Sequence, residues 1–186
     1  MIRRRLRFVI GAGLVAPIVL SGCTQAAQQR GARMSCERTG GGIDSAVVLM
    51  AQAVPTAGSL PCIQTFPSGW SVGSFEARSG FVRITFDSDR AGMRIFAVTL
   101  EQRCTVHGTP MPPTLAGATG LHGQIHRFEQ RYQATWYYTL PGACMMYGFD
   151  FPLRDAGQLL TDAVSMIRLL PRKTIKEQLN KAGFDL

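Results

Sequence analysis

Residues 70–87 read WSVGSFEARSGFVRITFD, and this stretch decides the fold class. Apolar and polar side chains alternate along residues 81–87, which is the pattern of an antiparallel strand with one buried face. Residues 70–77 show a similar extended pattern, and Ser79-Gly80 between the two runs is typical of a tight turn. The stretch therefore predicts a β-hairpin, with Val82, Ile84 and Phe86 on the buried face of its second strand.

The same alternation continues downstream. Residues 93–104 predict a third strand, and residues 122–132, 133–140 and 143–151 predict three more. Residues 107–120 contain three prolines and several glycines, so a long loop is expected there. Together these runs predict an antiparallel meander of about six strands.

Helical patterns lie on both sides of the predicted strands. Asp44 can cap a short helix within residues 43–54. Near the C-terminus, a capping box at Asp155 begins an apolar stripe that continues to Ile167, and Pro171 can end this helix and start another. Strands followed by helices predict an α+β domain, with one N-terminal helix and two C-terminal helices packed on one face of the sheet.

The N-terminus has the pattern of a bacterial export signal. Four arginines lie in the first seven residues, and an apolar run follows at residues 8–20. The sequence Leu20-Ser21-Gly22-Cys23 then resembles a lipobox, the lipoprotein maturation motif. The resemblance implies cleavage before Cys23 and a diacylglyceryl group on its sulfur. The alternative is an ordinary secretory signal with an accidental cysteine, and the export route, Sec or twin-arginine, is open.

These patterns divide the chain into three parts. Residues 1–22 are the predicted signal peptide, residues 23–42 a lipidated cysteine and flexible tether rich in Gln and Gly, and residues 43–186 a single extracytoplasmic domain. The formal net charge of +8 includes the four arginines of the signal peptide. The remaining basic residues are scattered, so we expect no nucleic-acid partner.

The cysteines are consistent with an oxidising destination. Lipid would occupy Cys23, which leaves four cysteines and three possible ways to pair them. We favour Cys36–Cys62, which brackets the first helix, and Cys104–Cys144, which would join two neighbouring strands. A zinc site is disfavoured because no CxxC spacing occurs.

Three motifs could indicate chemistry, and each lacks part of its pattern. Ser71 lies in a GxSxG sequence at residues 69–73, but a strand pattern follows it where a hydrolase needs a helix. His122 and His126 are four residues apart without the glutamate of HExxH, and on a strand they would lie roughly 13 Å apart. Residues 87–92 begin like a calcium loop but lack its later ligands. We therefore expect no metal and no other cofactor.

An aromatic cluster comprises Tyr132, Trp136, Tyr137 and Tyr138. At a period of two, Trp136 and Tyr138 share one face of a strand and Tyr137 takes the other. Two interpretations are open: the cluster can be core with cross-strand pairs, or a binding face for a glycan, lipid or protein.

Several strings carry a wider resemblance: AQAVPTA at 51–57, LPC at 60–62, PSGW at 67–70, DRAG at 89–92, WYY at 136–138, PGAC at 141–144, Tyr147 and FDF at 149–151. Over most of residues 45–170 the chain resembles a group of uncharacterised actinobacterial membrane-anchored exported proteins. The resemblance implies an extracytoplasmic domain with two disulfides. It implies no activity and no catalytic residue.

The leading hypothesis is a non-catalytic binding or accessory domain of the cell envelope. It would be held on the extracytoplasmic side of the cell membrane by lipid on Cys23, with an envelope protein or lipid as partner. One alternative is a carrier of an envelope lipid or small apolar ligand in a cavity of the sheet. The other is a serine hydrolase that uses Ser71 with one of the three histidines.

Overall fold

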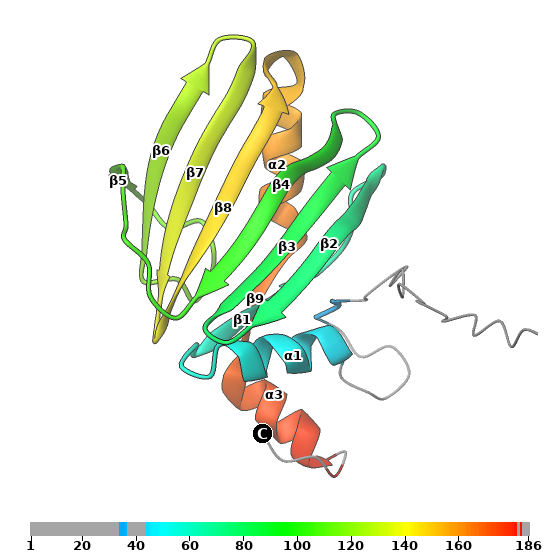
Figure 1. Cartoon of the computed structure of the whole chain (residues 1–186), viewed down its shortest axis with the longest axis vertical. Coiled ribbons are helices and arrows are strands. Elements are labelled where there is room, and N and C mark those ends of the chain that lie inside the picture. The colour runs from blue at the N-terminus through cyan, green and yellow to red at the C-terminus, as the bar shows by residue number, and fades with distance from the viewer. Residues whose placement is uncertain (1–33, 37–43, 182, 184–186) are drawn as a thin grey trace, which may run out of the picture.

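The computed structural model describes residues 34–36, 44–181 and 183, and it confirms the α+β class (Figure 1). In chain order the elements are α1 (Ser45–Ala53), β1 (Ser59–Ile63), β2 (Trp70–Arg78), β3 (Phe81–Ser88), β4 (Gly92–Glu101), β5 (Thr109–Met111), β6 (Gly120–Phe128), β7 (Arg131–Leu140), β8 (Ala143–Pro152), the 3-10 turn η1 (Leu153–Asp155), α2 (Ala156–Met166), β9 (Ile167–Pro171) and α3 (Arg172–Lys181). Among the described residues no helix is both long enough and apolar enough to span a membrane.

The large sheet has seven antiparallel strands in the order β2-β3-β4-β8-β7-β6-β5. The additional strand is β5, which lies within the predicted loop. The order also departs from a simple meander, because the chain crosses from β4 to the far edge at β5 and then builds β6, β7 and β8 inward, until β8 pairs with β4. Alternation of side chains predicts strands, but it does not specify which strands are neighbours.

A second, two-stranded sheet pairs β1 with β9. The sequence pattern extends the helix through Ile167 to Pro171, and this expectation is wrong: α2 ends at Met166 and Ile167 begins β9. Ile167 lies opposite Ile63 of β1 and is buried. The partner strand supplies the hydrogen bonds that a further helical turn would have provided, and this tertiary effect overrides the local pattern.

One helix precedes the strands and two follow them, as predicted, and all three contribute to one core. Figure 1 shows α2 against the back of the sheet, and α1 and α3 beyond its lower end. As predicted, Asp44 caps α1, because its Oδ1 accepts a hydrogen bond from the Ala46 amide at 3.3 Å. The capping box at Asp155 does not form: its side chain makes no cap hydrogen bond and instead pairs with Arg154.

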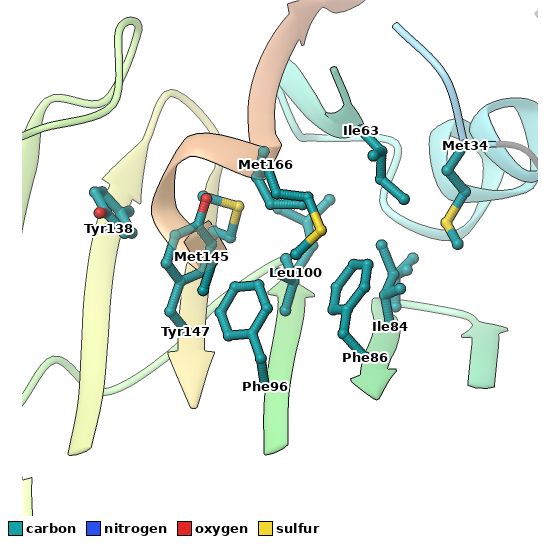
Figure 2. Packing of buried hydrophobic residues seen from close by; sticks show 14 of the residues in the cluster. Met34, Ile63, Ile84, Phe86, Phe96, Leu100, Tyr138, Met145, Tyr147 and Met166 are labelled. Carbon is teal, nitrogen blue, oxygen red and sulfur yellow. The ribbon is translucent and has the colours of Figure 1, made fainter. Parts of the chain in front are cut away.

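Aromatic rings fill the space between the sheet and α2. Phe96 stacks on Phe86 and on Phe149, with centroid distances of 5.3 and 5.4 Å, and its edge meets Tyr147 at 5.2 Å. Figure 2 shows this packing, with Met166 of α2 above the rings. Burial of such large apolar surfaces is the main stabilising contribution to the fold.

Both predicted disulfides are present, Cys36–Cys62 and Cys104–Cys144. Cys144 lies opposite Glu101, where β4 ends and β8 begins, so the second disulfide joins the two strands at the centre of the topology. Two disulfides in one domain indicate an oxidising, extracytoplasmic compartment.

The domain begins earlier than predicted. Met34 is buried, Ser35 forms a bridge with Ile63, and Cys36 is held by its disulfide, so part of the predicted tether packs against β1. The rest of the predicted tether, the predicted signal peptide and Cys23 lie outside the described residues.

Candidate functional site

The large sheet has one face turned away from α2, which we call the open face (Figure 1). Along β3, Val82, Ile84 and Phe86 point into the core, whereas Arg83 is exposed on the opposite side. No described helix packs on this side, and polar side chains of β3, β6, β7 and β8 gather there. The open face is therefore where a polar ligand could meet the sheet.

An irregularity in β4 shapes this face. Residues 93–95 bulge between the pairs Ser88–Gly92 and Phe86–Phe96, and pairing of β4 with β8 stops at Phe96. Within the bulge Arg94 has φ of 53°, the left-handed region, and is the one non-glycine among the described residues with positive φ. Its amide donates to Oδ1 of Asp87 at 2.7 Å, which holds the bulge in place.

The bulge borders a groove of about 340 Å³ on the open face. Ala97 and Gly148 form its floor, and these small residues leave the space above the sheet empty. Arg83 and Arg94 line one side of the groove, and His126 of β6 lines the other. The volume is at the lower end of the range for small-molecule sites.

One carboxylate, that of Asp150, lines the groove, and it is already engaged. Arg131 donates from Nε to its Oδ1 at 2.5 Å, and Gln133 donates to the same oxygen at 3.1 Å. Among the described residues no carboxylate forms an ion pair with Arg83 or Arg94. The groove therefore carries uncompensated positive charge.

A hydroxyl and an imidazole also meet in the groove. Nε2 of His126 and Oγ1 of Thr135 are 2.9 Å apart, so they share a hydrogen bond between β6 and β7. Such a pair resembles a nucleophile and its base, but no described side chain hydrogen-bonds the second ring nitrogen to orient it. Each of the two groups can donate a hydrogen bond to a ligand or accept one from it.

The structure separates Ser71 from the histidines. Ser71 is exposed on the edge strand β2, opposite Asp87, while His122 and His126 lie on β6. Five strand spacings lie between β2 and β6, roughly 24 Å along the sheet. A hydrolase site that combines Ser71 with either histidine does not form in this fold.

The other two histidines lie outside the groove. His107 meets Tyr137 edge-on, with the ring centroids 5.8 Å apart, and His122 lies opposite Tyr137 on the neighbouring strand. Nδ1 of His122 is buried without a hydrogen-bond partner. Within the described part of the chain no three His, Cys, Asp or Glu side chains gather as metal ligands.

The predicted aromatic face is mostly core. Tyr132, Tyr137 and Tyr138 are buried, and Trp136 is partly buried. Burial raises the pKa of Tyr132 and of Tyr138, and Oη of Tyr138 hydrogen-bonds Oγ1 of Thr114 at 2.9 Å. The binding-face interpretation therefore does not hold for the three tyrosines, because all three are buried. The Thr114 side chain contacts Tyr138, and the His107 ring lies against Tyr137 on the other face of the strand.

The sequence contains a weak signal for the groove. Alternation along β3 places Arg83 opposite the core, but nothing in the pattern brings it near His126 or Asp150. The site forms because β4 and β8 are neighbouring strands. Of the sequence predictions, only the Cys104–Cys144 pairing indicated that these two strands lie side by side.

No protein-family model matches the chain, and no curated protein and no solved structure is found to be similar to it. The candidate site therefore rests on the residues and the geometry of this chain.

Proposed function

We propose that this chain is an exported lipoprotein whose domain works by binding a ligand, not by catalysis, with the open-face groove as the binding site. One observation carries the proposal: polar side chains from five strands converge on a groove with a floor of small residues on the face that α2 leaves free. Binding sites typically combine such a concavity with a few polar groups that orient the ligand.

The proposal keeps Cys23 as the lipid-bearing residue and the cell membrane as the location. Met34 is packed into the domain, and it lies eleven positions after Cys23. A fully extended segment of that length spans roughly 38 Å. The lipid would hold the binding domain close to the outer surface of the membrane, where an envelope ligand or partner is available.

Replacing Cys23 by Ser tests the anchor. The full chain is expressed in a bacterial host that processes lipoproteins, and membrane and soluble fractions are compared. We expect the unaltered protein in the membrane fraction with acyl label, and Cys23→Ser in the soluble fraction without it. Membrane association that survives the substitution would argue against lipid anchoring.

Filling the groove tests the binding site. Gly148 has an ordinary φ, and a Cβ there would meet only the Cβ of Ala97 at 3.9 Å, so Gly148→Val should fold while occupying the groove. Thr99→Val, on the neighbouring strand β4 and outside the groove lining, is the control. Both are made in the Cys23→Ser chain and secreted into an oxidising compartment.

Native mass spectrometry, compared with the denatured mass, then reports the bound ligand. We expect a ligand from an envelope extract to bind the parent protein and Thr99→Val but not Gly148→Val. Turnover of a component of the extract that Thr135→Val abolishes would instead favour catalysis by the His126–Thr135 pair.

A carrier of an apolar envelope lipid is the second candidate, and one observation favours it. Ile125 and Phe128 on β6 are 62% and 63% exposed, unusual for large apolar side chains of a strand. Since rings fill the interior, an acyl chain would have to lie on this surface, against β6. A retained acyl-chain mass that persists in Gly148→Val but disappears in Ile125→Ser would support the carrier.

A further inference from the structure

We infer that the ligand of the open-face groove presents an oxyanion, a carboxylate or a phosphate, to Arg83 and Arg94. The inference rests on the proposed binding role of the groove and names the chemical class that it selects.

Charge is the first argument. Two guanidinium groups, those of Arg83 and Arg94, face the groove without a carboxylate partner among the described side chains. The lining acid, Asp150, is shared by Arg131 and Gln133. Of the other acids close by, Asp87 accepts the Arg94 amide, and Glu76, which lies opposite Arg83 on β2, pairs with Arg78. An anion would supply the charge that the lining lacks.

The backbone at Arg94 is the second argument. A left-handed conformation costs a non-glycine residue free energy that glycine avoids, and it occurs in strained turns and at functional sites. Here an arginine holds that conformation at φ 53°, although the glycine two positions earlier shows that the turn also accommodates glycine at positive φ. The bulge carries the Arg94 side chain into the groove beside Arg83, which sits on the adjacent strand β3.

The donor set is the third argument. Guanidinium groups bind carboxylates and phosphates through pairs of parallel hydrogen bonds. Across the groove, His126, Thr135 and Gln133 offer further hydrogen-bonding groups. The arrangement suits a polar molecule with one acidic end at the arginines and hydroxyl or amide groups toward β7. Both a free metabolite and a lipid headgroup have this chemistry.

Arg94→Gly provides a sharp test, because glycine fits the observed φ and keeps the backbone bond to Asp87. We expect Arg94→Gly to keep or raise the melting temperature while it weakens anion binding. Arg83→Gln removes the second guanidinium, and Arg103→Gln, an exposed arginine outside the groove lining, matches the charge change as a control. All variants are made in the Cys23→Ser chain.

Inorganic phosphate and acetate are titrated while nuclear magnetic resonance follows the backbone amides of Ala97, Thr135 and Gly148. We expect saturable shifts with at least one of the two probes. The apparent Kd should be weaker in Arg83→Gln than in Arg103→Gln, which loses the same single charge, and at least tenfold weaker than in the unaltered protein in the Arg83→Gln/Arg94→Gly double variant. Equal affinity in the double variant, or no saturable shift with either probe, would overturn the inference.

Vesicles identify the source of the anion. Sedimentation with phosphatidylglycerol vesicles that the double variant loses, and Arg103→Gln keeps, supports a lipid headgroup. Binding of the small anions alone supports a soluble acid. If a neutral ligand is retained in native spectra, is lost in Gly148→Val and is unaffected by the double variant, the oxyanion inference fails while the binding role of the groove stands.

Discussion

The indole N–H of Trp70 donates to Oδ2 of Asp162 at 3.2 Å, and this bond joins the edge strand β2 to α2. Arg90, from the turn between β3 and β4, donates to the same oxygen, and Gln158 donates to Oδ1 at 2.8 Å. One carboxylate thus ties the helix to two parts of the sheet. The GxSxG sequence has a structural role here: Gly69 adopts φ of 80° and Trp70 turns into the core.

Asp162 should make stability depend on acidity. Burial raises the pKa of this carboxyl, but hydrogen bonds from Arg90, Gln158 and Trp70 outweigh it and leave the pKa below its ordinary value. The stabilisation is therefore complete above the unfolded pKa, roughly 3.9, and is lost as pH falls through the lower folded value. We expect Asp162→Asn to lower the free energy of unfolding at pH 7 by about 1–3 kcal/mol.

Urea unfolding at pH 7 and pH 3 checks this prediction. The difference between the unaltered protein and Asp162→Asn should shrink at pH 3. A difference that stays the same at both values would mean that the ionised carboxylate is not the stabilising group.

Arg172 should be a structural residue, not part of a basic surface. Its guanidinium donates to the carbonyl oxygens of Ala51, Val54 and Ala57 at 2.9, 2.7 and 2.7 Å, so it caps the end of α1. Burial lowers its pKa. We expect Arg172→Ala to destabilise the fold by about 2–4 kcal/mol, because three carbonyls lose the guanidinium as a donor.

Lys173→Ala is the control for Arg172. Its side chain is 88% exposed and lies 3.9 Å from Glu177, and pairs of this kind contribute little. Arg172→Lys should fall between the two, since an ammonium cannot reach all three carbonyls. Thermal unfolding of the three variants measures the order, and equal midpoints for Arg172→Ala and Lys173→Ala would contradict the capping role.

Gly142 and Gly157 should respond to alanine in opposite directions. Gly142, in the turn between β7 and β8, has φ of 73°, and a Cβ there would lie 1.9 Å from the carbonyl oxygen of Thr56. Gly157 lies in α2 with open space around its Cβ position. We expect Gly142→Ala to cost more than about 1 kcal/mol and Gly157→Ala to stabilise by about 0.5–1 kcal/mol. Chemical denaturation of both variants measures the sign.

The Cys104–Cys144 disulfide should stabilise the fold slightly more than the Cys36–Cys62 disulfide. The disulfides have sequence separations of 40 and 26 residues, and loop-closure entropy for these lengths amounts to about 4 and about 3.5 kcal/mol. We therefore expect the Cys104→Ala/Cys144→Ala protein to unfold at lower denaturant than the unaltered protein. If reductant lowers the unfolding midpoint of the unaltered protein no further than the double substitution does, the Cys36–Cys62 disulfide contributes little to stability.

The local features of the fold could be predicted from the amino-acid sequence. Alternation along residues 81–87 and 143–151 was enough to predict β3 and β8, because a strand with one buried face must alternate. Asp44 marked the start of α1, and the even number of cysteines after Cys23 indicated two disulfides, whose favoured pairing the structure contains. Each of these features depends on a few consecutive residues or on a simple count.

Only the tertiary structure decided the features that depend on contacts between distant segments. The pairing of β4 with β8 brings Arg94 near Asp150, and the pairing of β1 with β9 ends α2 at Met166. Burial of Tyr138 depends on α2 and on the loop at Thr114. Side-chain periodicity specifies a face but not what covers it, because the free energy that selects one neighbour over another comes from packing that the local sequence does not contain.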